Sequence, residues 1–110
     1  MEHQLSESGG AIVIAFSGDI DLQTSPEARK ALLGLVGKGQ PILVDLSGVG
    51  YIDSSGVASL VECLQSVKKS GQKLALVSVS DGALRVLQLA RLDKVFVICG
   101  TVEEGVQSVT

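Results

Sequence analysis

The chain has 110 residues, a net charge of −3 and few aromatic side chains, which make up 3% of the sequence. Its length fits one domain over residues 1–110. The absence of any polybasic run argues against a nucleic-acid or anionic membrane surface. Residues 1–10 are polar, so they do not resemble a signal peptide, and no apolar stretch is long enough to span a membrane. We therefore predict a soluble, cytoplasmic protein.

The first half of the chain reads as two strands, a helix and a strand. Residues 3–7 alternate weakly and indicate an edge strand, and residues 11–16 form an apolar run that predicts a buried strand. A helix is expected to begin near Thr24 or Ser25, because Pro26 suits its first turn, and to end at residues 37–39. Residues 42–46 then predict a second buried strand.

The second half continues the alternation. Apolar residues at spacings of three and four predict a helix from about residue 57 to residue 67. Residues 73–79 predict a strand, residues 83–90 a helix, residues 95–99 a last strand and residues 102–109 a short final helix. The order β, β, α, β, α, β, α, β, α indicates an α/β fold with a largely parallel sheet.

The two cysteines, Cys63 and Cys99, are not arranged as a C-x-x-C pair. We interpret them as small packed side chains and not as a disulfide or a metal site. The sequence also has no phosphate-binding glycine motif and no serine-nucleophile elbow, and its one histidine, His3, has no partner near it in the sequence. We therefore expect no catalytic residues, no metal and no enzymatic activity.

The densest loop-like stretch runs from residue 47 to residue 56 and ends in Asp53-Ser54-Ser55-Gly56, just before a predicted helix. Asp53 or Ser54 stands where a helix N-cap is needed, because the first backbone N–H groups of a helix lack partners. A phosphate on a serine at this position would be tolerated by the positive end of the helix dipole. From the residues alone, a simple capping cluster and a phosphorylation site are about equally good interpretations.

A second acidic loop holds Asp19 and Asp21, directly after the strand at residues 11–16. An Asp-x-Asp pair in this place also begins haloacid-dehalogenase phosphatases, but Gln23 departs from their pattern. A response-regulator receiver is another alternative, with Asp45 as its acceptor, but Lys94 precedes the last strand where a receiver has a lysine after a late strand. A solvated acidic loop is favoured over both.

Four blocks of the sequence together resemble a STAS domain, the sulphate transporter and anti-sigma factor antagonist family. They are residues 17–21 (SGDID), 44–49 (VDLSGV), 51–57 (YIDSSGV) and 87–96 (LQLARLDKVF). The resemblance covers nearly the whole chain. It implies a small mixed, mostly parallel sheet of four to five strands with about four helices packed largely on one side.

The resemblance also implies a function. The phosphoacceptor of the family is the serine or threonine after the loop aspartate, which is Ser54 here, and Asp21 matches an acid that contacts the partner kinase. Partner binding is expected around Ser54, at Asp19, Asp21, Asp53, Ser55 and Gly56. Unphosphorylated, the chain would bind an anti-sigma factor that is also a serine kinase, and a serine phosphatase would reset it. ATP belongs to that partner, so the chain itself needs no cofactor.

Two other functions stay open at this point. The chain could be the STAS subunit of a phospholipid-transport ABC complex, docked on an ATPase subunit, with Ser54 as an interface residue. More distantly, it could be a protein that carries an aspartyl phosphate, such as a receiver or a phosphatase.

Overall fold

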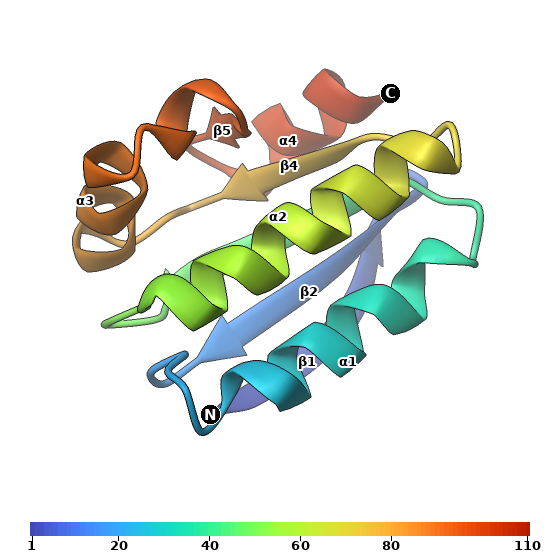
Figure 1. Ribbon diagram of the computed structural model, residues 1–110. Helices are drawn as coiled ribbons and strands as arrows, with labels where there is room; N and C mark the ends of the chain where they lie inside the picture. The colour runs from blue at the N-terminus through green and yellow to red at the C-terminus, as the bar shows by residue number, and fades with distance from the viewer.

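The computed structural model describes all residues from 1 to 110 and contains one five-stranded sheet in the order β1-β2-β3-β4-β5 (Figure 1). β1 and β2 form an antiparallel hairpin, and every later pair of neighbours is parallel. The sheet is therefore mixed and mostly parallel, as the sequence predicts. The strands are β1 (Glu2–Ser8), β2 (Ala11–Ser17), β3 (Ile42–Gly48), β4 (Leu74–Val77) and β5 (Val97–Cys99).

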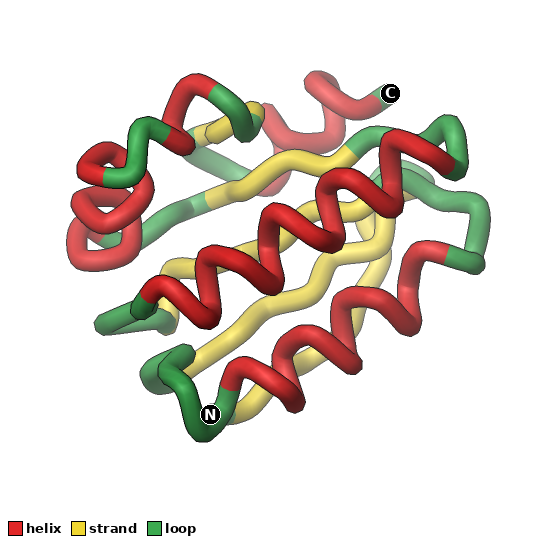
Figure 2. Tube along the Cα trace, viewed as in Figure 1, coloured by secondary structure: helices red, strands yellow, loops and turns green.

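Four α-helices and one short 3-10 turn connect the strands. The tube view shows helix and strand alternating along the chain after the initial hairpin (Figure 2). No helix is both long and apolar enough to cross a membrane. The helices are α1 (Ser25–Val36), α2 (Ser54–Lys69), α3 (Asp81–Leu89) and α4 (Val102–Val109), and the 3-10 turn η1 covers Leu92–Lys94.

The two faces of the sheet carry hydrophobic layers of different size. Strand residues such as Ile14, Val44 and Leu76 pack with α1, α2 and α3 into a cluster of 22 buried residues. The alternate residues, among them Leu43 and Val77, pack against α4 in a cluster of 6. This follows from the two-residue period of a strand, which sends neighbouring side chains to opposite faces. Most of the helical layer thus lies on one side, as expected.

Strand lengths differ from the predictions mainly near the C-terminus. The last strand begins at Val97 and not at residue 95, because η1 follows Arg91, whose φ of 59° is left-handed and turns the chain. β4 is also shorter than residues 73–79. His3 does have a neighbour, since its ring centroid lies 6.0 Å from that of Phe16 on β2. Cys63 is buried and Cys99 half-buried, as expected for packed thiols.

Candidate functional site

Two loops meet at the carboxyl ends of β2 and β3, and the helices α1 and α2 start from them. We name residues 18–24 the first loop and residues 49–53 the second loop. The Ile20 N–H donates to the Tyr51 carbonyl at 3.0 Å, and the Asp53 N–H donates to the Ile20 carbonyl at 3.1 Å. These bonds extend the parallel sheet by one isolated bridge, Ile20 to Ile52. Backbone bonds therefore hold together the two loops, which carry Asp19, Asp21 and Asp53 and lead into the helix that begins with Ser54, Ser55 and Gly56.

Asp53 is the N-cap of α2. Its backbone is extended (φ −99°, ψ −174°), and its Oδ1 accepts hydrogen bonds from the N–H of Ser55 at 2.9 Å and of Gly56 at 3.1 Å. The hydroxyl of Ser55 also donates to Oδ1, at 2.5 Å. This hydroxyl bond, with smaller help from the backbone N–H groups of Gly56, Ser55 and Leu22, lowers the pKa of Asp53 below its ordinary value.

Ser54 and Ser55 differ in what their hydroxyls do, although both stand in the first turn of α2. Ser54 is exposed, and its hydroxyl makes no hydrogen bond in the structure. Ser55 is half-buried, and its hydroxyl is held by Asp53. A hydroxyl that is free and exposed can reach a second protein, whereas the Ser55 hydroxyl would first have to leave its carboxylate partner.

Asp21 is engaged inside the first loop. Its Oδ1 accepts from the N–H of Gln23 at 3.0 Å, from the N–H of Thr24 at 3.1 Å and from the Thr24 hydroxyl at 3.2 Å. The Asp21 N–H in turn donates to the Thr24 hydroxyl at 2.9 Å. Asp21 therefore shapes the turn that leads into α1, a role that the sequence did not indicate. Asp19 is exposed, and only its carbonyl is used, by the Thr24 hydroxyl.

Gly56 is buried where the two loops and α2 press together. A Cβ atom at this position would lie 2.7 Å from Cγ1 of Ile52 and 2.8 Å from Cγ2 of Ile20. Real Cβ atoms do not come this close to neighbours, so any side chain here forces the loops apart. Gly56 is thus a packing requirement of the site and is not itself available to touch a partner.

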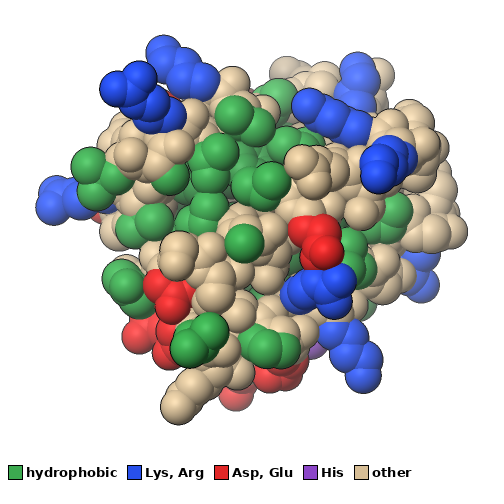
Figure 3. Space-filling view, in the orientation of Figure 1, with side chains coloured by type: hydrophobic (Ala, Val, Ile, Leu, Met, Phe, Trp, Pro, Cys, Tyr) green, Lys and Arg blue, Asp and Glu red, His purple; other side chains and the backbone are tan.

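Two exposed apolar side chains of the site have no counterpart in the sequence-based predictions. Leu22 of the first loop is 76% exposed, and Tyr51 of the second loop is 50% exposed. Large apolar side chains flanked by charged groups are typical of protein–protein contacts. In the space-filling view, acidic and hydrophobic side chains gather side by side at the end of the molecule where the loops lie (Figure 3). Only the structure shows this exposure, since Leu22 and Tyr51 read as ordinary loop residues.

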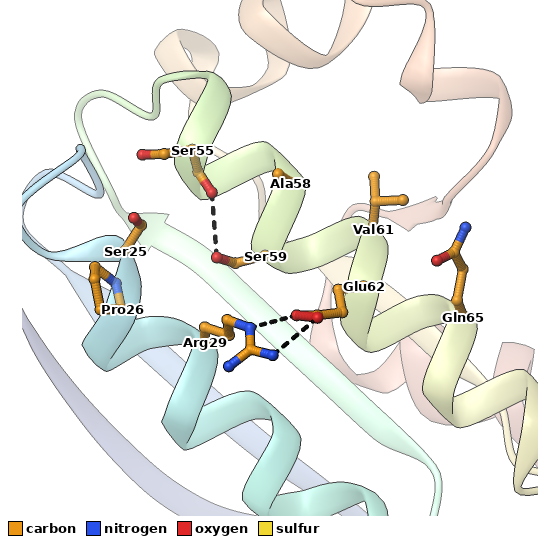
Figure 4. A pocket seen from close by; sticks show the side chains of 9 residues that line it. All are labelled: Ser25, Pro26, Arg29, Ser55, Ala58, Ser59, Val61, Glu62 and Gln65. Carbon is orange, nitrogen blue, oxygen red and sulfur yellow. Dashed lines mark hydrogen bonds and ion pairs between the residues drawn. The ribbon is translucent and has the colours of Figure 1, made fainter.

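A groove of about 700 Å³ runs between α1 and α2 beside this site (Figure 4). Arg29 of α1 and Glu62 of α2 bridge it, with Nε–Oε2 at 2.5 Å and Nη2–Oε1 at 2.9 Å. The bond to Arg29 lowers the pKa of Glu62, and the pKa of Arg29 is raised by the same bond. The pair joins the two helices that start from the loops, and Ser55 lines the upper end of the groove.

The chemistry available at this site is that of recognition. One free serine hydroxyl stands at a helix N-terminus, with carboxylates and two exposed apolar side chains around it. No group of three or more His, Cys, Asp or Glu side chains is placed to hold a metal ion. The fold is that of a small α/β domain, and the site brings an exposed serine, carboxylates and exposed apolar side chains together at one end of it.

Comparison with known proteins names the family of this domain. The model of the STAS domain matches residues 2–105, so the chain belongs to the STAS domain family. The anti-sigma-B factor antagonist of Bacillus subtilis is 31% identical over 96 residues, which are 87% of this chain and 88% of that protein. The structure of an anti-sigma factor antagonist from Mycobacterium paratuberculosis superposes with a TM-score of 0.89 at 25% identity, covering 98% of this chain and 92% of that one.

The same fold occurs in the antagonist SpoIIAA, whose structures are known in two forms. The unphosphorylated form has a TM-score of 0.79 at 19% identity, over 97% of this chain and 95% of that one. The phosphorylated form has a TM-score of 0.73 at 20% identity, over 97% and 98%. The relatives are named as anti-sigma factor antagonists. The predictions of a STAS fold and of this family are confirmed.

Proposed function

We propose that the chain is an anti-sigma factor antagonist whose binding to its partner is turned off by phosphorylation of Ser54. The partner in this proposal is an anti-sigma factor with serine kinase activity, which supplies the ATP, and a serine phosphatase reverses the modification. The antagonist would act in the cytoplasm, where it frees a sigma factor by occupying the anti-sigma factor. The relatives, which are named as anti-sigma factor antagonists, support this partner class.

One observation carries the choice of serine. Of the two neighbouring hydroxyls, only that of Ser54 is both exposed and without a hydrogen bond, because Asp53 holds Ser55. A kinase must bring the acceptor oxygen to the γ-phosphate of ATP in line with the bond that breaks. Ser54 can do so without any change in the cap of α2. That SpoIIAA, a protein of the same fold, is known in a phosphorylated form supports a phosphorylated state for this chain.

The surface around Ser54 explains how a phosphate would act. Leu22 and Tyr51 offer apolar area for a partner, and Asp19, Asp21 and Asp53 surround it with negative charge. A phosphate adds a charge of about −1.5 to −2 to that surface. A partner that closes over the loops would have to bury this charge beside Asp53, which disfavours binding. The fold itself would not change, since the N-terminus of α2 tolerates an anion.

The test uses the chain with an anti-sigma factor kinase from the same organism. With ATP, intact-mass analysis should show one added phosphate on the parent and on Ser55→Ala, and none on Ser54→Ala. In calorimetric titrations, Ser54→Asp should stay folded but lose binding at least roughly 30-fold, because an unpaired buried charge costs about 2 kcal/mol or more. Equal phosphorylation of Ser54→Ala and the parent would overturn the choice of serine. Capture of a transporter ATPase in place of an anti-sigma factor would favour the role of a phospholipid-transport subunit.

A further inference from the structure

We propose that two copies of the chain pair through the free edge of β1 around a two-fold axis at Leu5, forming one continuous ten-stranded sheet. This inference concerns a surface that contains neither loop of the Ser54 site, and it does not depend on the proposed function. It begins from the edges of the sheet, which are β1 on one side and β5 on the other.

The two edges differ in how well they are protected. β5 has three residues, and a very short edge strand is one way in which proteins avoid sheet-to-sheet association. β1 has seven residues, pairs with β2 without a bulge, and contains neither lysine nor proline. Of the usual protections of an edge, β1 has only charged side chains, those of Glu2 and Glu7. Figure 1 shows β1 at the margin of the sheet, with no strand beyond it.

The free hydrogen-bonding groups of β1 can be assigned from its neighbours. The Ile12 N–H donates to the Pro41 carbonyl beside β3, so the backbone of Ile12 faces away from β1. Backbone groups alternate in direction along a strand, so Ala11 and Val13 face β1, where they oppose Ser8 and Ser6. The N–H and C=O groups that point to the open edge therefore belong to the other set of residues, His3, Leu5 and Glu7.

A two-fold axis at Leu5 uses all of these groups. In an antiparallel pair centred on Leu5, each Leu5 opposes Leu5 of the second copy, and each His3 opposes Glu7 of the second copy. These are the residues whose N–H and C=O groups are free, so all six donors and acceptors on one copy find partners. An axis on Gln4 or Ser6 would also face free groups toward free groups, but it would leave Glu7 or His3 of each copy without a residue of β1 opposite it.

The side chains agree with the same axis. Leu5 is 55% exposed and lies in a shallow groove beside Ala31 and Leu35 of α1. Pairing would cover this leucine with its own copy, and an imidazole would stand opposite a carboxylate on either side. Glu27 and Lys38 line the same groove toward its two ends. Because α1 of the second copy runs in the opposite direction, the axis brings Glu27 of one copy toward Lys38 of the other.

The self-association is tested first by sedimentation. We expect the apparent mass of the parent chain to rise from 11.4 kDa toward twice that value as the protein concentration increases. Leu5→Lys should stay at the single-chain mass at the same concentrations, because two like charges would face each other across the axis. Circular dichroism confirms that this exposed variant is folded. A parent that stays monomeric up to millimolar concentration overturns the proposal.

A cysteine scan then tests the register. Paired Cα atoms across the axis should lie about 5.5 Å apart, within the range of a disulfide. Under mild oxidation, Leu5→Cys should form a linked dimer roughly ten-fold or more faster than Leu22→Cys, because pairing raises the local thiol concentration. Ser6→Cys is the matched control on the same strand, and the parent controls for Cys63 and Cys99. Equal rates for Leu5→Cys and Leu22→Cys, or faster linking through Ser6→Cys, would overturn this register.

Discussion

The first and second loops follow neighbouring strands, and Asp21 in the first loop and Asp53 in the second have different structural roles. In the first loop, Asp21 accepts three hydrogen bonds from residues of its own turn, and the N-cap of α1, Thr24, makes no side-chain capping bond. In the second loop, Asp53 bonds directly to the first turn of α2. The first aspartate closes a loop, whereas the second begins a helix.

The difference shows which hydroxyl group near the loops has no hydrogen-bond partner. Asp53 satisfies the orphan N–H groups of α2 and also engages the Ser55 hydroxyl, so the only unengaged hydroxyl in that turn is that of Ser54. The carboxylates of Asp21 and Asp53 are both engaged in hydrogen bonds that shape the backbone. At this site, the group that remains available to a second protein is therefore the Ser54 hydroxyl, and the aspartates mainly hold the backbone in place.

The largest effect is expected where both loops contact the same residue, Gly56. Gly56→Ala should lower the free energy of unfolding by about 1–3 kcal/mol, because its Cβ would collide with Ile20 of one loop and Ile52 of the other. Chemical denaturation measures the change. The same variant should bind partners more weakly, since the loops must separate to admit the methyl group.

Gly34→Ala is the matched control in α1. Nothing lies within 4 Å of a Cβ at Gly34, so this change should stabilise the chain by about 0.5–1 kcal/mol through the better helix propensity of alanine. If Gly56→Ala is as stable as Gly34→Ala, the loops are not packed as closely as the structure has them.

Much of the fold could be predicted from hydrophobic periodicity. The buried runs before residue 50 and the apolar stripe of α2 gave the correct element types and order, because one face of each element is covered. The start of β5 could not be predicted in this way. Val95 and Val97 read as buried strand residues but are 48% and 50% exposed. The left-handed φ of Arg91 occurs at a residue type that seldom adopts it, so the sequence does not signal this turn.

The site was predictable only in part. The pattern Asp53-Ser54-Ser55-Gly56 indicates a helix start, and Asp53 is indeed the cap. Which serine stays free could not be read from the pattern, because it depends on which hydroxyl the carboxylate engages. The exposure of Leu22 and Tyr51 and the turn held by Asp21 depend on how the loops lie against each other.

The next largest effect is on the melting temperature, which should fall by different amounts when Asp53 and Asp21 are replaced. Asp53→Ala should lower the melting temperature by about 5 °C, the usual size for a lost N-cap in a domain of this length. Asp53→Asn should lose much less, since asparagine caps as well as aspartate. Asp21→Ala should cause a smaller fall than Asp53→Ala, because it loosens a turn and leaves the first turn of both helices capped as before. A fall for Asp21→Ala equal to that for Asp53→Ala would remove the distinction between the loops.

The pH dependence of stability tests the same capping bonds from Asp53 to the first turn of α2. The pKa of Asp53 is lower in the folded chain than its ordinary value of 3.8, so its charged form stabilises the fold above that pH. That stabilisation is lost as the pH falls through the lower, folded value. Asp53→Asn should therefore lose less stability than the parent between pH 5 and strongly acidic solution, measured as melting temperature against pH. The pair of Arg29 and Glu62 acts in the same direction and is unchanged in both proteins.

The smallest effect distinguishes the two adjacent serines. The largest cause of the lowered pKa of Asp53 is the hydroxyl bond from Ser55, which lies 2.5 Å from Oδ1. Ser55→Ala removes this donor, so the pKa of Asp53 should rise toward its ordinary value. Ser54→Ala removes an exposed hydroxyl that makes no hydrogen bond, so it should leave that pKa and the melting temperature unchanged. An NMR titration of the Asp53 carboxyl carbon measures this pKa in the two variants, and a thermal melt measures their melting temperatures.

If the pKa of Asp53 rose as much in Ser54→Ala as in Ser55→Ala, Ser54 would also take part in the cap. The hydroxyl proposed for phosphorylation would then be part of the capping network, and modifying it would disturb the start of α2 as well as the partner surface.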